Sequence, residues 1–205
     1  MKKSKVMLFG AMALTAGLAL AACGSSQSSN ADKTYSYIFV NNPDTLDYIT
    51  STRDSTSSIT TNLIDGLLEN DQYGNLIPSM AESWTVSKDG LTYTYKIRQG
   101  AKWYTSEGEE YADVTAHDFV TGLKYAADKK AENLYLVQDS IKGLADYVEG
   151  KSSDFGTVGV KAVDDYTLQY TLNQPETYWN SKTTASILNP VNEAFLKSKG
   201  DDFGS

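Results

Sequence analysis

Apolar and polar residues alternate most regularly over residues 84–97, where two alternating runs flank a Lys-Asp-Gly tripeptide at 88–90. A repeat of two residues is typical of a strand with one buried face. An Asp-Gly step between two such runs favours a hairpin, because glycine accepts the positive φ angle that the turn requires. Residues 158–175 repeat this pattern, with a turn at 164–165 and an end at Pro175. The sequence therefore predicts two antiparallel hairpins.

A repeat of three to four residues predicts a helix over residues 114–130. Thr115 and Asp118 have the spacing of a capping box at its start. The apolar stripe of this helix consists of Phe119, Leu123, and Ala126 or Ala127. Because only one face is apolar, we expect the helix to pack on a core through that stripe.

Weaker patterns predict the remaining elements. Residues 34–40 alternate and predict a strand, while residues 57–68, 135–150 and 190–200 predict helices. In the first of these helices the expected inner residues are Ile59, Leu63, Ile64 and Leu67. Together these elements predict a mixed α/β (α+β) fold with antiparallel hairpins.

The first 22 residues have a different pattern, in which lysines at positions 2, 3 and 5 precede 17 uncharged residues. The uncharged run is apolar on all sides, so it has no amphipathic face with which to pack on a core. It is also short and rich in glycine for a membrane span. Small residues, Ala21 and Ala22, end it. This layout predicts a secretory signal peptide over residues 1–22.

Cys23, the only cysteine of the chain, follows this run directly. A single cysteine forms no internal disulfide, no CxxC pair and no thiolate metal cluster. The tetrapeptide Leu-Ala-Ala-Cys at 20–23 resembles the bacterial lipobox, which implies cleavage before Cys23 and its acylation. Several acyl chains, at about 0.8 kcal/mol per buried methylene, give lasting attachment to a membrane. The serine-rich residues 23–33 then predict a flexible tether.

The chain carries a net charge of −8, from 18 basic and 26 acidic residues. Three of the lysines belong to the predicted signal peptide, so the rest of the chain is more acidic still. A surface of this sign argues against nucleic acid as a partner, because the phosphate backbone is itself negative.

The sequence contains no pattern that indicates catalysis. His117, the only histidine, lies beside the expected helix cap, where an exposed histidine is far more common than a catalytic one. Acidic pairs at 109–110, 164–165 and 201–202 fit turns better than a pair of catalytic carboxylates. No GxSxG, HExxH or phosphate-binding glycine motif occurs. The sequence indicates a binding protein rather than an enzyme, with no cofactor and no metal site.

Residues 45–126 contain an ordered series of motifs that resembles a known family. The series runs from a Leu-Asp turn through an Asp-Gly-Leu step and Ala-Glu-Ser-Trp to an Asp-Gly turn. It continues with Arg-x-Gly-x-Lys-Trp and a helix that contains Thr-Ala-x-Asp-Phe. This series is similar to the N-terminal part of the family 5 extracellular solute-binding proteins, the peptide- and nickel-binding receptors of ABC importers. With the lipobox-like segment, the chain is very similar to streptococcal oligopeptide-binding lipoproteins of the Ami and Ali type.

The resemblance implies the two-lobed, periplasmic-binding-protein-like class II solute-binding fold, with only its N-terminal part in this chain. Such proteins close by a hinge motion on an extended peptide, which they hold through its backbone as an added strand. The implied partners are oligopeptides and the membrane subunits of an ABC permease. The implied location is the extracellular face of the cell membrane, in the manner of a Gram-positive lipoprotein.

The resemblance also implies how the chain divides. Residues 34–64 form the first piece of one lobe, residues 65–189 form the family's second domain, and residues 190–205 begin the return to the first lobe. We expect residues 65–189 to be better protected from hydrogen exchange than 31–56 and 190–205.

Matched position by position, the resemblance implies peptide contacts at four residues. Thr52, Arg53 and Asp54 fall in the peptide-pairing strand of the family, where an acidic residue is common. Tyr135 falls where the family has a ligand-contacting tyrosine. The alternative interpretation is structural, with a plain loop at 52–54 and a core position for Tyr135.

Family members are more than twice as long as this chain, and the opposing lobe carries the acid that pairs with the peptide's α-amine. We therefore expect the 205-residue chain alone to bind peptide weakly or not at all. Two other interpretations stay open, namely a truncated receptor without a transport role and a surface lipoprotein with an adhesion or decoy role. Nickel as cargo fits the overall similarity less well than peptide.

Overall fold

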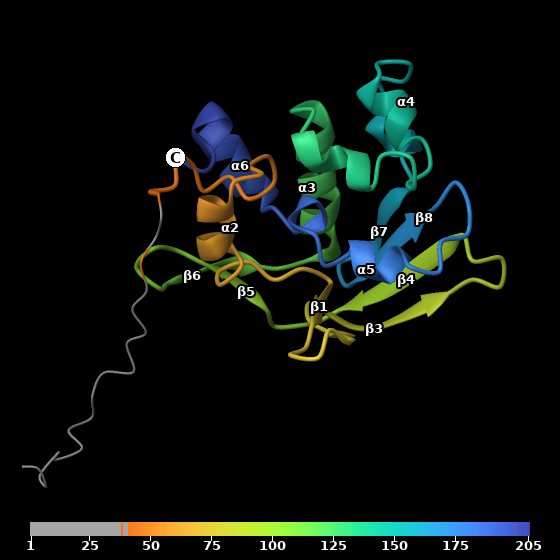
Figure 1. Cartoon of the computed structure of the whole chain (residues 1–205), viewed down its shortest axis with the longest axis horizontal. Coiled ribbons are helices and arrows are strands. Elements are labelled where there is room, and N and C mark those ends of the chain that lie inside the picture. Colours follow the sequence, from red (N-terminus) through yellow and green to blue (C-terminus); the bar gives the residue numbers. More distant parts are fainter. Residues whose placement is uncertain (1–37, 39–40) are drawn as a thin grey trace, which may run out of the picture. The chain divides into compact units, whose positions relative to one another are not determined.

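The computed structural model describes Ile38 and residues 41–205. The predicted signal peptide, Cys23 and the tether lie outside the described residues, as does the predicted strand at 34–40 apart from Ile38. Residues 41–205 belong to a single compact unit, in which helices and strands form separate layers (Figure 1).

The two predicted hairpins combine into one antiparallel sheet. Its strands are β3 (Ala81–Val86), β4 (Thr92–Ile97), β7 (Val160–Asp164) and β8 (Thr167–Thr171). The hairpins join through β4 and β8, where Tyr95 lies opposite Leu168, so the strand order is β3-β4-β8-β7. Alternation along β4 buries Tyr93, Tyr95 and Ile97, which confirms the inward face predicted for this strand.

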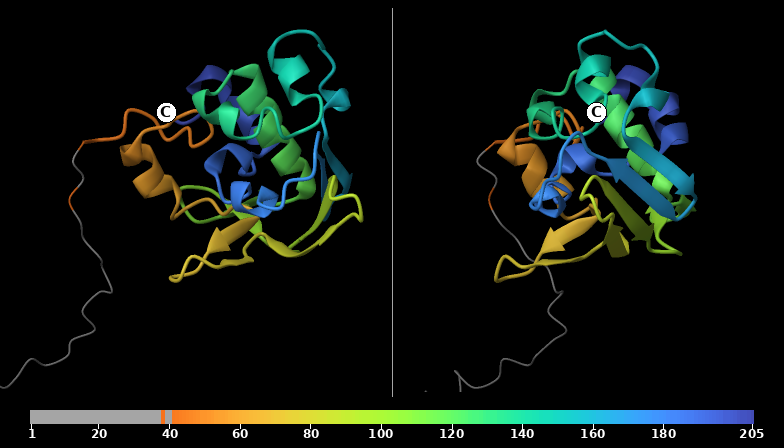
Figure 2. Two further views of the ribbon diagram at one scale, coloured as in Figure 1. Left: turned by 45° about the vertical axis from the view of Figure 1, so that its right-hand side comes forward. Right: turned by 90° about the vertical axis from the view of Figure 1, so that its right-hand side faces the viewer.

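Two smaller hairpins and a set of short helices complete the unit. The hairpins pair β1 (Leu68–Asn70) with β2 (Leu76–Pro78), and β5 (Lys102–Tyr104) with β6 (Glu110–Asp113). The α-helices are α2 (Asp54–Thr60), α3 (Ala116–Asp128), α4 (Leu144–Val148), α5 (Trp179–Lys182) and α6 (Glu193–Lys199). The 3₁₀ helices are η2 (Glu132–Leu136), η3 (Phe155–Thr157), η4 (Ser186–Leu188) and η5 (Gly200–Asp202). The β1–β2 hairpin, drawn in yellow, projects away from α3 (Figure 2).

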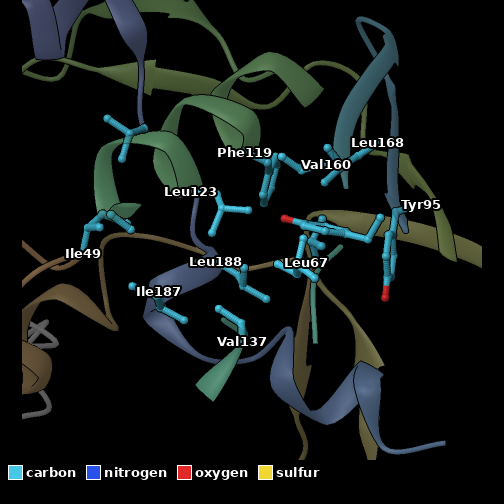
Figure 3. Packing of buried hydrophobic residues seen from close by; sticks show 14 of the residues in the cluster. Ile49, Leu67, Tyr95, Phe119, Leu123, Val137, Val160, Leu168, Ile187 and Leu188 are labelled. Carbon is cyan, nitrogen blue, oxygen red and sulfur yellow. The ribbon is translucent and has the colours of Figure 1, made fainter. Parts of the chain in front are cut away.

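Helix α3 supplies the central apolar face of the core. The Asp118 carboxylate accepts a hydrogen bond from the Thr115 backbone N–H at 2.8 Å, as the capping box requires. Phe119 and Leu123 are fully buried, which confirms the predicted stripe. Figure 3 shows these side chains directed from the helix toward the cluster that contains Leu67. Each buried side chain of this size contributes about 1.5–3 kcal/mol to folding.

The helix predicted over residues 57–68 is wrong in its end and, at Leu63, in its inner face, whereas Leu67 is buried and Ile64 packs on the core as expected. Helix α2 ends at Thr60, and the Leu67 carbonyl accepts a hydrogen bond from the Ala81 backbone N–H at 2.9 Å. This strand-like pairing prevents a helix from continuing through residue 67. Leu63 is 68% exposed, whereas the threonines at positions 56 and 60 are buried.

The predicted helix over residues 135–150 is also wrong as a single element. Ile141 forms a β-bridge with Leu172, and the Lys142 backbone N–H donates to the Thr171 carbonyl at 3.0 Å. Gly143 then adopts a left-handed φ of 71°. These contacts occupy the backbone groups that a continuous helix needs, so only η2 and α4 form. By contrast, α6 and its glycine end confirm the helix predicted at 190–200.

Candidate functional site

The structure brings the two groups of predicted peptide-contacting residues together. The Thr52 hydroxyl donates a hydrogen bond to the Glu132 carboxylate at 3.2 Å. Glu132 is the first residue of η2 and Tyr135 follows three positions later, and side chains at i and i+3 of a 3₁₀ helix eclipse. We call the surface formed by Thr52, Arg53, Asp54, Glu132 and Tyr135 the 52–135 surface.

The 52–135 surface is open to a ligand. Tyr135 is 73% exposed, so its interpretation as a core residue is wrong. Residues 52–54 are exposed as well. An exposed tyrosine offers a flat apolar ring and a hydroxyl that can donate or accept a hydrogen bond. Its contact with a peptide stays a prediction.

The charges of the 52–135 surface are mainly negative. Arg53 is paired with Asp44, with its Nε 3.0 Å from a carboxylate oxygen. Asp54 lies in the first turn of α2, and Glu132 lies in the first turn of η2. Because the Arg53 guanidinium is paired with Asp44, the carboxylates of Asp54 and Glu132 make the 52–135 surface negative. Such a surface suits a cationic group, such as the ammonium of a lysine side chain.

A buried carboxylate fixes the loop that leads to residue 52. Asp47 accepts hydrogen bonds from the backbone N–H groups of Ile49 at 3.0 Å and Thr50 at 3.1 Å. It also accepts one from the Tyr125 hydroxyl of α3 at 2.8 Å. Burial, followed by the neighbouring Asp47, raises the pKa of Tyr125, so this hydroxyl stays protonated and donates. The Leu-Asp turn of the sequence is thus anchored to the central helix.

The C-terminal residues close over the same loop. The Gly204 carbonyl accepts hydrogen bonds from the Leu46 backbone N–H at 2.6 Å and from the Thr45 hydroxyl at 3.1 Å. A Cβ on Gly204 would lie 2.3 Å from the Asp47 backbone nitrogen, so only glycine permits this approach. Phe203 stacks edge-on against Tyr125, with ring centroids 5.3 Å apart.

Glu132 is a site residue that the sequence reasoning missed. It lies 80 positions from Thr52, and no local pattern links residues so far apart. One signal in the sequence could have drawn attention to Glu132, namely its place three residues before Tyr135.

The described residues offer little other chemistry. His117 is exposed at the start of α3, as expected, and its Nε2 lies 3.4 Å from an Asp165 oxygen. Within 41–205 and at Ile38, His, Asp and Glu form no group of three placed to hold a metal ion. The same residues contain no helix with the length and hydropathy of a membrane span. Cys23 lies outside this part of the chain, and its lipid attachment stays a prediction.

Comparison with known proteins agrees with the predicted resemblance. Residues 75–205 match the family described as bacterial extracellular solute-binding proteins, family 5 Middle. The chain is 66% identical over 202 residues to oligopeptide-binding protein AliB of Streptococcus pneumoniae serotype 4, covering 98% of this chain and 31% of AliB. It is 64% identical over 210 residues to oligopeptide-binding protein SarA of Streptococcus gordonii, covering 99% of this chain and 32% of SarA.

A solved structure shares the fold as well as the sequence. Listeria monocytogenes OppA bound to peptide matches with a TM-score of 0.70 and 34% identity, over 78% of this chain and 31% of that protein. The predicted fold class is thereby confirmed, and the chain spans 31% of the length of AliB, one of its curated relatives. The chain belongs to the bacterial extracellular solute-binding proteins of family 5.

Proposed function

We propose that this chain is the N-terminal part of the peptide receptor of an ABC importer, which captures oligopeptides and delivers them to the permease in the membrane. The observation that supports this best is the 66% identity to an oligopeptide-binding protein over 98% of the chain. The peptide bound to Listeria OppA, a protein of the same fold, is consistent with that ligand class.

In this proposal the 52–135 surface contributes one side of the peptide site. The backbone of residues 52 and 53 pairs with an extended peptide, and the exposed Tyr135 ring contacts one of its side chains. Asp54 begins helix α2, so its backbone is not part of the predicted pairing strand and only its carboxylate faces the ligand. Backbone pairing recognises any sequence, whereas the carboxylates of Asp54 and Glu132 favour cationic peptides. The rest of the site comes from a second lobe, so we expect peptide affinity of the 205-residue chain to be weak.

Nuclear magnetic resonance titration tests this assignment, because it detects binding in the millimolar range. A Lys-Ala-Ala-Ala peptide is added to the isotope-labelled 205-residue chain, and amide shifts are mapped. We expect shifts at residues 51–54 and 132–136. Shifts confined to other residues, or no shifts at all, contradict the placement of the site. An affinity in the micromolar range would contradict the need for a second lobe.

A matched pair of tyrosine variants separates recognition at a defined site from nonspecific binding to exposed aromatic rings. Tyr135→Ala should weaken peptide binding at least tenfold. Tyr73→Ala removes an equally exposed ring, 80% exposed, from the β1–β2 turn, and should change binding less than twofold. Equal losses in the two variants would show that the peptide binds exposed aromatic rings without a defined site.

We further propose that Cys23 carries acyl chains and anchors the receptor at the outer face of the cell membrane. The intact mass of the protein extracted from the membrane fraction tests this. A mass increased by acyl chains, with residues 1–22 removed, is the expected result, and an unmodified cysteine contradicts it. A mass near that of residues 23–205 plus lipid, together with failure to bind peptide, would instead favour a truncated receptor or a decoy lipoprotein.

A further inference from the structure

A groove lies beside the edge of the sheet, at the opposite end of α3 from the 52–135 surface. Its volume is about 580 Å³, and residues 156–162 form one wall. The other lining residues are His117, Val120, Lys142, Gln169 and Thr171. His117 and Asp128 are separated by about 16 Å along the helix axis, at 1.5 Å per residue. The groove is therefore a separate place on the molecule.

The groove has the opposite charge to the chain as a whole. Its titratable lining residues are His117, Lys142 and Lys161, all basic, in a chain of net charge −8. In the described part of the chain, no carboxylate oxygen lies within 4.0 Å of the Lys142 or Lys161 ammonium.

Two acids close in sequence to the lining residues have other partners. Asp165 pairs with His117, and an Asp154 oxygen accepts a hydrogen bond from the Gly156 backbone N–H at 2.8 Å. The two lysines are therefore available to an anionic ligand.

The wall of the groove includes the start of an edge strand. β7 is the last strand in the order β3-β4-β8-β7, so no described strand pairs with it on the side away from β8. An edge of this kind presents unpaired N–H and C=O groups to an added strand. The Val160 N–H is not among them, because it donates to the Val158 carbonyl at 2.8 Å. A register shift between Ala162 and Asp164 limits such pairing to the first half of β7, from Val160 to Ala162.

We propose that this groove binds an acidic, extended polypeptide segment of a partner protein. The edge of β7 hydrogen-bonds its main chain, while Lys142 and Lys161 pair with its carboxylates. The partly exposed Val120 gives an apolar side chain of the segment a surface to contact, beside the buried valines at 158 and 160. A free phosphate would use only the two ammonium groups and leave the strand edge without a partner, so the chemistry of the whole groove favours a polypeptide.

The test needs only the 205-residue chain, because every residue of the groove lies between positions 117 and 171. The probe is the acetylated and amidated peptide Glu-Val-Glu-Val-Glu, whose alternate side chains point to opposite faces when extended. Its Gln-Val-Gln-Val-Gln counterpart is the uncharged control. We expect the acidic probe to shift the amide signals of residues 158–162 in a titration, and the control to bind at least tenfold more weakly.

Charge-matched variants show whether the groove, rather than net charge, is responsible. The double variant Lys142→Gln/Lys161→Gln should weaken binding of the acidic probe at least tenfold. Lys88→Gln/Lys130→Gln removes the same charge from exposed positions outside the groove and should change binding less than twofold.

Three results overturn the proposal. They are equal losses in the two double variants, no shift at 158–162, and inorganic phosphate that binds as tightly as the peptide and displaces it. Each is independent of peptide capture at the 52–135 surface, which the Tyr135 variant reports separately.

Discussion

Two regions of this chain are held together by different forces. Under α3, the core consists of apolar side chains such as Phe119, Leu123 and Leu168, all with no exposed surface. The clasp, which we define as residues 44–53 with residues 203–205, also buries Tyr48, Ile49 and Phe203, but it adds directional hydrogen bonds to Asp47 and Gly204. Hydrophobic burial is non-directional and proportional to area, whereas a buried carboxylate stabilises only while its donors stay in place. The core therefore sets whether the unit folds, and the clasp sets where residues 52–54 lie.

Aromatic rings connect the two regions. Phe203 of the clasp contacts Tyr125 of α3 and lies 6.0 Å, between ring centroids, from Tyr48. The Tyr48 hydroxyl donates to the Pro190 carbonyl at 2.7 Å. These contacts couple the clasp to the central helix, so loosening the clasp should move the 52–135 surface while the sheet stays intact.

The largest expected loss in the free energy of unfolding comes from a substitution in the core. Phe119→Ala removes a fully buried ring and leaves a cavity, which should lower the free energy of unfolding by about 3–5 kcal/mol. Urea unfolding followed by circular dichroism measures this. Val86→Ala, at a position that is 45% exposed at the end of β3, is the control and should cost far less. Similar losses in both variants would mean that α3 does not organise the core.

Asp47→Ala should cause the next largest loss in the free energy of unfolding. Unlike the core substitution, it should loosen the clasp. Four buried or partly buried donors, the backbone N–H groups of Ile49 and Thr50 and the hydroxyls of Thr50 and Tyr125, lose their acceptor, at about 1–3 kcal/mol for each group left unsatisfied, offset where water enters. Hydrogen exchange should accelerate at residues 44–53 and 203–205 but not in the sheet. Tyr125→Phe removes one of these bonds and should cost about 1 kcal/mol. Uniform acceleration across the unit would contradict a separate clasp.

The difference between the core and the clasp also explains which parts of the structure the sequence could predict. The two hairpins follow from a repeat of two residues, and α3 follows from a repeat of three to four. Such repeats involve only residues that are close together in the sequence. The bonds from Tyr125 to Asp47 and from Thr52 to Glu132 join residues 78 and 80 positions apart, and no local repeat encodes them. The resemblance predicts contacts at Thr52 and Tyr135, but it does not indicate the carboxylate of Glu132, which accepts the bond from Thr52.

Local pattern also fails where backbone pairing overrides it. Residues 135–150 have helical spacing, yet Ile141 pairs with Leu172 and Gly143 turns the chain in a left-handed conformation. The pairing partner lies far along the chain, so the break is visible only in three dimensions. The Thr-lined inner face of α2 is a similar case, because Thr56 is buried through its bond to the Thr45 carbonyl of the clasp at 2.7 Å.

Asp118, in the first turn of α3, gives a pH-dependent test of stability. Its backbone carbonyl also accepts a hydrogen bond from the Val191 backbone N–H at 2.9 Å. Burial raises the pKa of its carboxyl above the ordinary value of 3.8, and this outweighs the hydrogen bonds from Thr115 and Trp103. The folded state therefore holds the proton more tightly than the unfolded state. Its contribution to stability should fall as pH rises from 3.8 to the raised value, and stay constant above it.

The Asp118→Asn variant isolates this effect. Asparagine keeps an oxygen acceptor for Trp103 and Thr115 but does not titrate. The free energy of unfolding of the variant minus that of the wild type should therefore increase with pH across the window and level off above it. Urea unfolding at a series of pH values between 3.5 and 7 measures the difference. A difference that decreases with pH would show that the hydrogen bonds outweigh burial.

The smallest expected effect is at the surface of the clasp. Arg53 and Asp44 form an ion pair whose side chains are 68% and 61% exposed. Solvent and salt screen such a pair, so Asp44→Asn should change the free energy of unfolding by less than about 0.5 kcal/mol. The same substitution frees the Arg53 guanidinium beside the 52–135 surface, which should weaken binding of the cationic Lys-Ala-Ala-Ala peptide. Binding loss without stability loss would place Arg53 at the peptide, whereas stability loss above 1 kcal/mol would make the ion pair part of the clasp.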